Sequence, residues 1–343
     1  MPSSLVLITG ATGHLGYRTL IETLKAGYHV RAAVRNEAGI KKIRAAESTQ
    51  PYLNHIEFVF VPDMEKEDAY NEAVKGVKNI IHLASPIPHH VPVSDSAEME
   101  ALIVQPAIRG TLNMLRAAKA HSPTTERIVI TTSILALISW ADFFGQSGKV
   151  FNETSRTLVV SGSYENGLQA YAAGKVAALK VTEEFVVIEQ PHFTVNNVAP
   201  SAVIGKNEIA TTAADSISGT NSIALGHVLG LSQGPTPSAV VYLDDIARTH
   251  ILALSPSVPG NQVFIGVSDN SNNRWEDAFD VVKQNFPQAV TDGTFPLTGS
   301  NPTIRLIIDN SWTRKTLHQE FLPYAEQVRS VAQHYLDLKG TAW

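Results

Sequence analysis

The sequence predicts an α/β protein whose main domain is a doubly wound parallel sheet, with a smaller lobe toward the C-terminus. In the first 200 residues, short apolar segments alternate with amphipathic ones, and a glycine-rich turn directly follows the first apolar segment. Hydrophobic residues make up 44% of the chain and charged residues 17%, values typical of a globular protein with a sizeable core. Strands that are apolar throughout and separated by helices predict a parallel sheet covered on both faces.

Six strands and five helices are expected in the first 200 residues. The strands are predicted at 5–9, 30–34, 57–61, 79–83, 127–132 and 194–198. The helices are predicted at 15–26, 40–46, 66–74, 105–120 and 168–189. Pro191 ends the last of them, because proline cannot continue a helix. Right-handed crossovers between such units give the doubly wound arrangement.

The pattern becomes looser after Pro200. Residues 201–238 are rich in Ser, Thr, Gly and Ala, a strand-to-helix unit returns at 240–254, and residues 270–300 are mostly polar. We therefore expect a main domain of residues 1–200, to which 239–268 and about 304–310 return. The smaller lobe is expected to comprise 201–238 and 269–343.

Composition excludes several classes of protein. The net charge is −5, and the basic cluster at 41–44 is interpreted as a solvated helix face, so no nucleic-acid partner is expected. The absence of cysteine excludes disulfides and thiolate catalysis and fits a cytoplasmic protein. No apolar run approaches the roughly 18 residues of a membrane span. His82 and the pair His89-His90 lack ligands at helical spacing, so no metal is expected.

The turn after the first strand has the spacing G-x-x-G-x-x-G, with glycines at Gly10, Gly13 and Gly16. Gly10 permits the tight turn, Gly13 lets the backbone approach a pyrophosphate, and Gly16 allows the helix to pack closely on the sheet. The amides at the helix start then face the anion. This predicts a Rossmann-type dinucleotide site, to which Thr12, His14 and Leu15 also contribute. A tight strand-to-helix turn without a ligand is the alternative.

The end of the second strand indicates which dinucleotide binds. NAD enzymes usually carry an acidic residue there, which bonds the ribose 2′-hydroxyl. Here that position holds Val34, and Arg35 follows it. An arginine fork suits a 2′-phosphate, so we expect NADPH/NADP+ as cofactor. Lys42 is expected to approach the same phosphate.

Tyr171 and Lys175 form a Y-x-x-x-K element inside a predicted helix. Spacing i, i+4 places the phenol and the ammonium on one face. We expect the cation to lower the pKa of Tyr171 and so to make it a better general acid. Ser133, at the carboxyl end of a strand, lies where it can hydrogen-bond a carbonyl; a loop-capping serine is the alternative.

Ordered matches along nearly the whole chain resemble the extended short-chain dehydrogenase/reductases, and within them the dihydroflavonol-reductase and yeast/fungal aldehyde-reductase branch. The matches include T-G-A-T-G-H-L-G at 9–16, V-R-A-A-V-R-N at 30–36, I-I-H-L-A-S-P at 80–86, T-T-S at 131–133, Tyr171 with Lys175, V-A-P at 198–200 and L-D-D-I-A-R-T-H at 243–250.

The resemblance implies roles for individual residues. Around the cofactor it implies that Asp63 and Met64 contact the adenine, that Leu83, Ala84 and Ser85 line the adenosine and pyrophosphate, and that Thr131, Pro200 and Val203 border the nicotinamide. In the reaction it implies that Ser133 bonds the substrate carbonyl, that Tyr171 delivers the proton, and that Lys175 also binds the nicotinamide ribose.

The segment after Ser133 departs from plant dihydroflavonol reductases, which argues against a flavonoid substrate. It begins with Ile134, and Trp140 and Phe143 follow. The resemblance implies that these side chains wall the pocket of a substrate-binding lobe and favour aryl or alkyl carbonyl compounds. Packing in the lobe core is the alternative for the aromatic residues.

The resemblance therefore implies an NADPH-dependent carbonyl reductase that converts a ketone or aldehyde to an alcohol, acting as a monomer or homodimer. Two alternatives remain. One is a sugar-nucleotide epimerase or dehydratase that retains NAD, which the Arg35 position disfavours. The other is a non-catalytic NADPH sensor, which the tyrosine–lysine pair disfavours.

Overall fold

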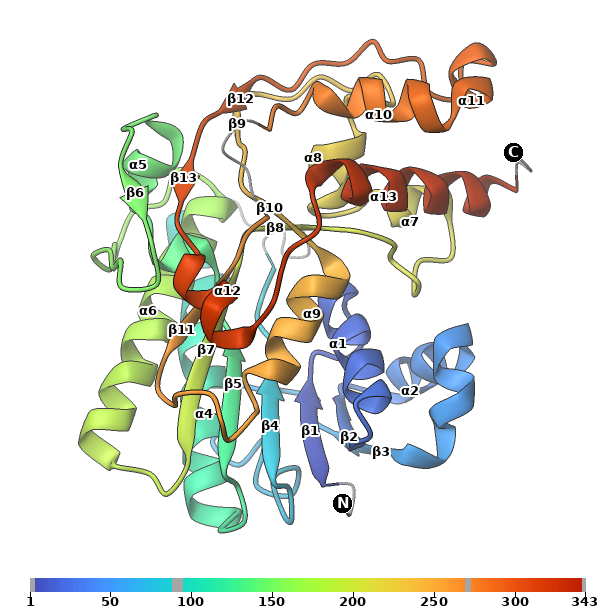
Figure 1. Cartoon of the computed structure of the whole chain (residues 1–343). Helices are drawn as coiled ribbons and strands as arrows, with labels where there is room; N and C mark the ends of the chain where they lie inside the picture. Colours follow the sequence, from blue (N-terminus) through green and yellow to red (C-terminus); the bar gives the residue numbers. More distant parts are fainter. Residues whose placement is uncertain (1–3, 88–94, 269–272, 341–343) are drawn as a thin grey trace.

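A computed structural model describes residues 4–87, 95–268 and 273–340 and shows a central sheet with helices on both faces (Figure 1). Seven parallel strands form the sheet in the order β11-β7-β5-β4-β1-β2-β3, which confirms the predicted doubly wound fold. These strands are β1 (Leu5–Thr9), β2 (His29–Val34), β3 (Ile56–Phe60), β4 (Asn79–His82), β5 (Arg127–Thr131), β7 (Thr194–Pro200) and β11 (Val263–Gly266).

Helices connect these strands and extend into the C-terminal part. The α-helices are α1 (His14–Lys25), α2 (Glu37–Ala45), α3 (Ser96–Met99), α4 (Gln105–His121), α5 (Trp140–Phe144), α6 (Gly167–Glu189), α7 (Ala213–Ser216), α8 (Asn221–Leu225), α9 (Leu243–Leu252), α10 (Asp277–Asn285), α11 (Pro287–Thr291), α12 (Ser311–Leu317) and α13 (Tyr324–Lys339). Shorter helical segments are the 3-10 helices η1 (Glu47–His55) and η4 (Ile134–Ala136) and the π-helical η3 (Glu100–Val104).

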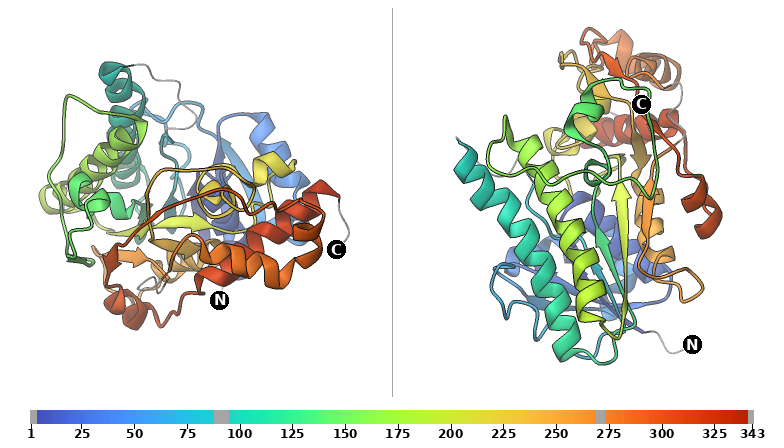
Figure 2. Two further views of the ribbon diagram at one scale, coloured as in Figure 1. Left: turned by 90° about the horizontal axis from the view of Figure 1, so that it is seen from above. Right: turned by 90° about the vertical axis from the view of Figure 1, so that its left-hand side faces the viewer.

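Both faces of the sheet carry a hydrophobic core. Side chains alternate along β1, so Val6 and Ile8 join a cluster with α1 and α9, whereas Leu7 joins a cluster with α4 and α6. The helices α4 and α6 lie side by side (Figure 2). Each fully buried Leu or Ile side chain contributes on the order of 1.5–3 kcal/mol. The two cores hold the strand ends, and therefore the glycine turn, in place.

The predicted helix at 66–74 is wrong. The segment forms successive turns, in which Ala69 N donates to Lys66 O and Val74 N donates to Tyr70 O. Its apolar residues still pack in the α4/α6 cluster. The side chain of Asn113 on α4 donates to Lys66 O at 2.9 Å, so a distant helix satisfies a carbonyl that a local helix would otherwise use.

The C-terminal part lies beyond the carboxyl ends of the sheet strands, in the upper part of Figure 1. Two short parallel pairs in this part join β8 (Ala202–Ile204) to β10 (Val240–Tyr242) and β9 (Thr236–Pro237) to β12 (Thr303–Ile304). A further pair joins β13 (Ile307–Ile308) to β6 (Val150–Phe151), which comes from the segment after η4. A third hydrophobic cluster includes Trp275, Phe286 and Phe295 together with Val328 and Val331 of α13. The division into a main domain and a substrate lobe stays a prediction.

Residues 205–208, which we call the junction segment, connect the C-terminal part to the start of α1. His14 Nε2 donates to Gly205 O at 3.1 Å. The Asn221 side chain donates to the same carbonyl at 2.9 Å and accepts from Gly205 N at 3.0 Å. The backbone at Gly205 is thus held from α1 and from α8 at once.

Two further side chains hold the rest of the junction segment. Glu208 accepts hydrogen bonds from Ser48 N at 2.8 Å and from Ser48 Oγ at 2.7 Å, which connects it to η1. His334 on α13 donates from Nε2 to Asn207 O at 2.9 Å. The segment is therefore bonded to the glycine-turn helix, to η1 and to the C-terminal helix.

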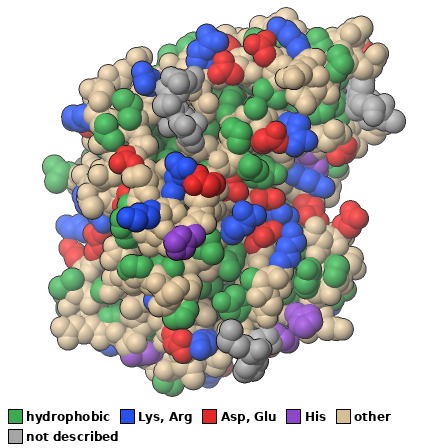
Figure 3. Space-filling model, in the orientation of Figure 1, with side chains coloured by type: hydrophobic (Ala, Val, Ile, Leu, Met, Phe, Trp, Pro, Cys, Tyr) green, Lys and Arg blue, Asp and Glu red, His purple; other side chains and the backbone are tan. Residues whose placement is uncertain are grey.

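Charged side chains of both signs are intermingled on the face shown in Figure 3. Several are paired, including Arg18 with Glu22 at 3.1 Å and with Asp244 at 2.6 Å. Within the described residues, no helix is both long and apolar enough to cross a membrane.

Candidate active site

The glycine turn lies at the carboxyl end of β1. Successive strands are added on one side of β1 as far as β3 and on its other side from β4 onward, so the order of strands reverses between β1 and β4. Gly10 has a φ of +74°, and a Cβ there would lie 2.9 Å from Ala84 N. A Cβ at Gly16 would lie 2.0 Å from Gly10 O. Gly13 is the N-cap of α1, and its amide donates to Gly10 O at 3.0 Å. The turn therefore requires glycine at Gly10 and Gly16, as expected for a tight turn and for close packing of the helix start on the strand end.

The ends of β1 and β4 are connected through one hydroxyl. Thr9 Oγ1 accepts hydrogen bonds from Leu83 N and Ala84 N, both at 3.1 Å. It lies 2.9 Å from His82 Nδ1. Because the two amides occupy both lone pairs, the Thr9 hydroxyl donates its proton to His82 Nδ1. These bonds place Leu83 and Ala84, two predicted cofactor residues, against the turn.

The side chains expected around the adenosine lie at the ends of β2 and β3. Arg35 and Lys42 are exposed, which leaves both available to a phosphate. Asp63 Oδ1 accepts from Glu65 N at 2.9 Å. Met64 O accepts from the Asn113 side chain at 3.1 Å, and the Met64 methyl packs against Gly110. These contacts position Asp63 and Met64, and their roles toward a cofactor stay predictions.

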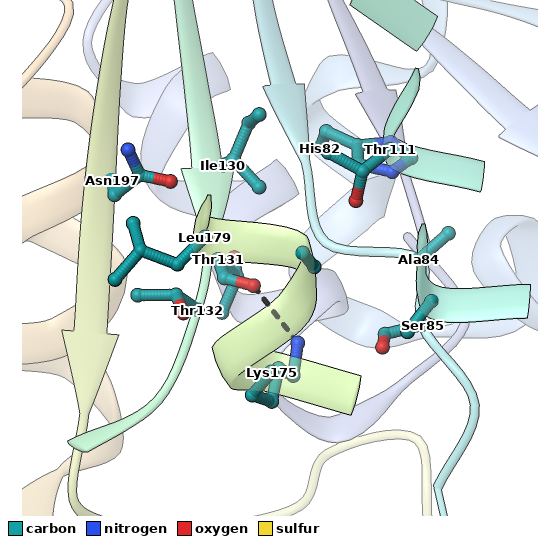
Figure 4. Close-up of a pocket in the computed structure, with 12 residues that line it drawn as sticks. His82, Ala84, Ser85, Thr111, Ile130, Thr131, Thr132, Lys175, Leu179 and Asn197 are labelled. Atoms are coloured by element: carbon teal, nitrogen blue, oxygen red, sulfur yellow. Dashed lines mark hydrogen bonds between the residues drawn. The ribbon is translucent and has the colours of Figure 1, made fainter. Parts of the chain in front are cut away.

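Lys175 and Tyr171 lie on α6 at the carboxyl end of β5. Lys175 Nζ donates to Thr131 O at 2.9 Å (Figure 4) and lies 5.5 Å from the centroid of the Tyr171 ring. Lys175 shares a cavity with Ala84 and Ser85 from the segment after β4. The structure thus brings the predicted tyrosine–lysine pair, the end of β5 and the cofactor-lining segment together.

The pKa values of the pair are shifted by burial. Burial raises the pKa of Tyr171 to about 12 and lowers the pKa of Lys175 to about 8. The shift of the Tyr171 pKa is thus opposite to the expected one, and its cause is desolvation. The phenol is consequently protonated at neutral pH, which is the form that a proton donor needs.

His250 on α9 bonds the end of β5 at the site, a role that the sequence analysis did not predict. It is 0% exposed, and its Nδ1 lies 2.7 Å from Ile246 O. A carbonyl only accepts, so Nδ1 carries the proton and Nε2 is the acceptor for the Thr131 hydroxyl at 2.8 Å. Burial lowers the pKa of His250 to about 4, which keeps the ring neutral. The sequence signal that could have indicated this role is a histidine on the same helix face as the apolar residues Leu243, Ile246 and Ala247.

Ser133 begins η4 directly after β5. Its Oγ accepts a hydrogen bond from Leu135 N at 3.2 Å, which is the capping contact considered as the alternative. That bond uses a lone pair and not the hydroxyl proton. Ser133 can therefore cap η4 and still donate a hydrogen bond to a ligand.

The predicted pocket residues Ile134, Trp140 and Phe143 differ in what they contact. Ile134 is 4% exposed and belongs to a hydrophobic cluster with Leu179, against which Phe143 packs. Trp140 and Phe144 rings meet edge to face with centroids 4.8 Å apart. Phe143 thus packs against a core cluster, whereas α5 buries none of its residues completely, and the contact of these side chains with a substrate stays a prediction.

The strand ends that would border a nicotinamide are also buried. Pro200 ends β7 and is buried, whereas Val203 on β8 is partly buried against the same cluster as Leu15. Among the residues of the described ranges, no group of three or more His, Asp or Glu side chains is placed to hold a metal ion. His89 and His90 lie outside the described residues.

Fold and site together define a dinucleotide-binding protein with a Tyr–Lys pair at the carboxyl edge of a doubly wound sheet. Residues 6–266 match the model of the NAD dependent epimerase/dehydratase family. The chain belongs to this family, and the predicted resemblance to extended short-chain dehydrogenase/reductases is confirmed.

Named relatives and solved structures resemble the whole chain. Ketoreductase CTB6 of Cercospora beticola is 34% identical over 351 residues, which cover 98% of this chain and 96% of that protein. NAD-dependent epimerase/dehydratase FUM13 of Gibberella moniliformis is 30% identical over 365 residues, with 98% and 96% covered. The structure of yeast methylglyoxal/isovaleraldehyde reductase Gre2 complexed with NADPH superposes with a TM-score of 0.80 at 22% identity, with 98% and 99% covered. At that identity, the last comparison supports the fold alone.

Proposed function

We propose that this protein is an NADPH-dependent carbonyl reductase that reduces a ketone or aldehyde to an alcohol, with Tyr171 as proton donor. One observation carries the proposal: Lys175 Nζ, beside the Tyr171 ring, is bonded to the end of β5 in the cavity that Ala84 and Ser85 also line. A partly buried phenol and an ammonium at the carboxyl end of β5 support the proposal, because doubly wound folds bind dinucleotides at that edge of the sheet.

The residues present fit an NADP dinucleotide. Glycine at Gly10 and Gly16 permits the tight turn from β1 into α1, which is the turn that holds the pyrophosphate in doubly wound folds. Exposed Arg35 at the end of β2, with Val34 in place of an acid, suits a 2′-phosphate. When bound, the dinucleotide supplies the hydride, and the protein supplies position and electrostatics.

The chain's own residues then perform three tasks. Ser133 Oγ, whose proton is not used by its cap contact, donates a hydrogen bond to the substrate carbonyl. Tyr171 Oη donates a proton to the same oxygen as negative charge develops on it. Lys175 holds the nicotinamide ribose and stabilises the phenolate left by proton donation.

The substrate is proposed to be a small carbonyl compound held between the main sheet and the lobe of residues 201–238 and 269–343. Support comes from the relatives named as ketoreductases and from the position of the C-terminal part beyond the carboxyl ends of the strands. Among carbonyl classes, these relatives favour ketones.

A second candidate is an epimerase or dehydratase that retains NAD. Two relatives at 30% identity are named as NAD-dependent epimerase/dehydratases, which favours it. It predicts bound cofactor that survives purification and turnover without net consumption. Arg35 argues against it, because a bare ribose hydroxyl does not require an arginine.

The test follows NADPH absorbance with a panel of ketones, aldehydes and diketones, with NADH in parallel. We expect consumption with NADPH, and we expect Tyr171→Phe to abolish it while NADPH binding remains. The matched control is Tyr335→Phe on α13, whose ring packs against Phe295 with centroids 5.9 Å apart. Activity with NADH alone, or full activity of Tyr171→Phe, would refute the proposal.

A further inference from the structure

A row of side chains crosses four adjacent strands beneath α4 and α6. The register pairs Thr9 with His82, His82 with Ile130, and Ile130 with Asn197. Paired residues in parallel strands point to the same face of a sheet. An apolar core face therefore carries three polar side chains, Thr9, His82 and Asn197, and the last two line the cavity that contains Lys175 (Figure 4).

The protonation of His82 follows from its neighbour. Thr9 donates its hydroxyl proton to His82 Nδ1, because its lone pairs are occupied by two backbone amides. Burial lowers the pKa of His82 to about 3, so the ring is neutral and its proton is on Nε2. His82 is 2% exposed, and Nε2 has no hydrogen-bond partner within the described part of the chain. A buried N–H donor without a partner costs about 1–3 kcal/mol.

Two acceptors in the same cavity are also unpaired. Asn197 Oδ1 and Thr132 Oγ1 are buried and have no partner among the residues in the described ranges. Lys175 Nζ uses one of its three N–H groups on Thr131 O. One small cavity therefore combines two N–H donors, from His82 and Lys175, with oxygen atoms from Asn197 and Thr132.

We infer that this cavity is a binding site for about one ordered water molecule, which is held by His82 Nε2–H and hydrates the ammonium of Lys175 from the side of the sheet. A water molecule matches the set of groups, since it accepts two hydrogen bonds and donates two. A cation does not, because His82 presents an N–H and Lys175 is itself positive. His82 is thus a positioning residue that acts through the water.

The consequence concerns the charge of Lys175. The titratable groups facing it are Tyr171 on its own helix and His82 on β4, while β5 and α4 contribute the non-titrating Thr131 and Thr111. With a neutral phenol and a neutral imidazole, the water and the Thr131 carbonyl together compensate for the lost hydration of the ammonium. Removing the protein partners of the water should therefore lower the pKa of Lys175. The link to turnover rests on the proposed function, but the water site does not.

The experiment uses the full-length protein without cofactor or substrate. Nitrogen-15 NMR of labelled histidine reports the His82 tautomer, and a high-resolution crystal structure reports the water. Labelled-lysine NMR follows the titration of Lys175. His82→Asn keeps an acceptor for Thr9 but has no N–H at the position of Nε2, because its side chain is shorter, whereas Thr132→Val removes a hydroxyl with little change of shape. Thr182→Val is the matched control, because Thr182 is equally buried on α6 and bonds Ala178 O at 2.8 Å.

We expect the Nε2–H tautomer, a water within hydrogen-bond distance of it, and a pKa of Lys175 lower by about one unit or more in both cavity variants. The control should leave that pKa unchanged. A dry cavity, the Nδ1–H tautomer, or equal pKa values in all variants would overturn the inference. Since none of these readouts requires catalysis, a failure here is distinct from a failure of the reductase proposal.

Discussion

The bond between Thr131 and His250 makes a specific prediction about stability. Thr131 Oγ1 lies 2.8 Å from Nε2 of a ring that is 0% exposed, and the other ring nitrogen is already bonded to Ile246 O. Thr131→Val leaves Nε2 buried and unpaired, which costs about 1–3 kcal/mol of unfolding free energy. Thr182→Val removes a hydroxyl from a carbonyl that retains its helical bond, so its cost is expected to stay below about 1 kcal/mol.

Urea unfolding followed by tryptophan fluorescence measures both costs, provided that the m-values agree. A double-mutant cycle with His250→Leu adds a second criterion. If the two side chains stabilise the fold through one bond, the double variant should be more stable than the sum of the single costs predicts, by about 1 kcal/mol. Equal costs for Thr131→Val and Thr182→Val, together with additive effects in the cycle, would show that the bond contributes nothing.

Three further predictions concern the cofactor and pH. Arg35→Ala should raise KM for NADPH about tenfold or more in steady-state assays, since a charge-assisted bond contributes about 1.5–3 kcal/mol. KM for NADH should stay nearly unchanged, and equal losses with both cofactors would contradict this. Gly16→Ala places a Cβ 2.0 Å from Gly10 O and should abolish NADPH binding in a fluorescence titration, whereas Gly234→Ala, with open space around it, should not. The pKa of Lys175 is lowered to about 8, so the charged form is lost above that pH and the reduction rate should fall as pH rises through 8; a rate that stays constant to pH 10 would refute a role for the ammonium.

The strands were predictable because the two faces of a parallel sheet impose one simple pattern. Val6, Leu7 and Ile8 are all buried, and such a continuous apolar run bounded by a glycine turn has few other structures available. The motifs also indicated that the Tyr171–Lys175 pair and the end of the strand at 127–132 belong to one site, and the structure adds the bond from Lys175 to Thr131 O.

The segment 66–74 shows where local reasoning fails. Its buried residues Tyr70, Ala73 and Val74 have helical spacing, but a few turns can bury the same side chains. The deciding interaction comes from Asn113, which lies 47 residues from Lys66 in the chain. No local pattern contains that information.

The histidines of the site are a second example. The partner of His82 lies 73 residues away and that of His250 lies 119 residues away. Their tautomers depend on whether the opposing atom can only accept or has its lone pairs occupied, and only the folded arrangement determines this. Burial also depends on the folded arrangement, so the sequence alone did not show that desolvation raises the pKa of Tyr171.

The junction segment has a consequence for dissecting the protein into parts. A fragment ending at Pro200 would contain every strand before β8 but would leave His14, which begins α1 after the glycine turn, without its acceptor at Gly205. Ser48 would likewise lose the carboxylate of Glu208. Residues 1–200 are therefore not expected to fold as a module that can be excised and grafted, and new specificities would have to be built by replacing loops within the intact chain.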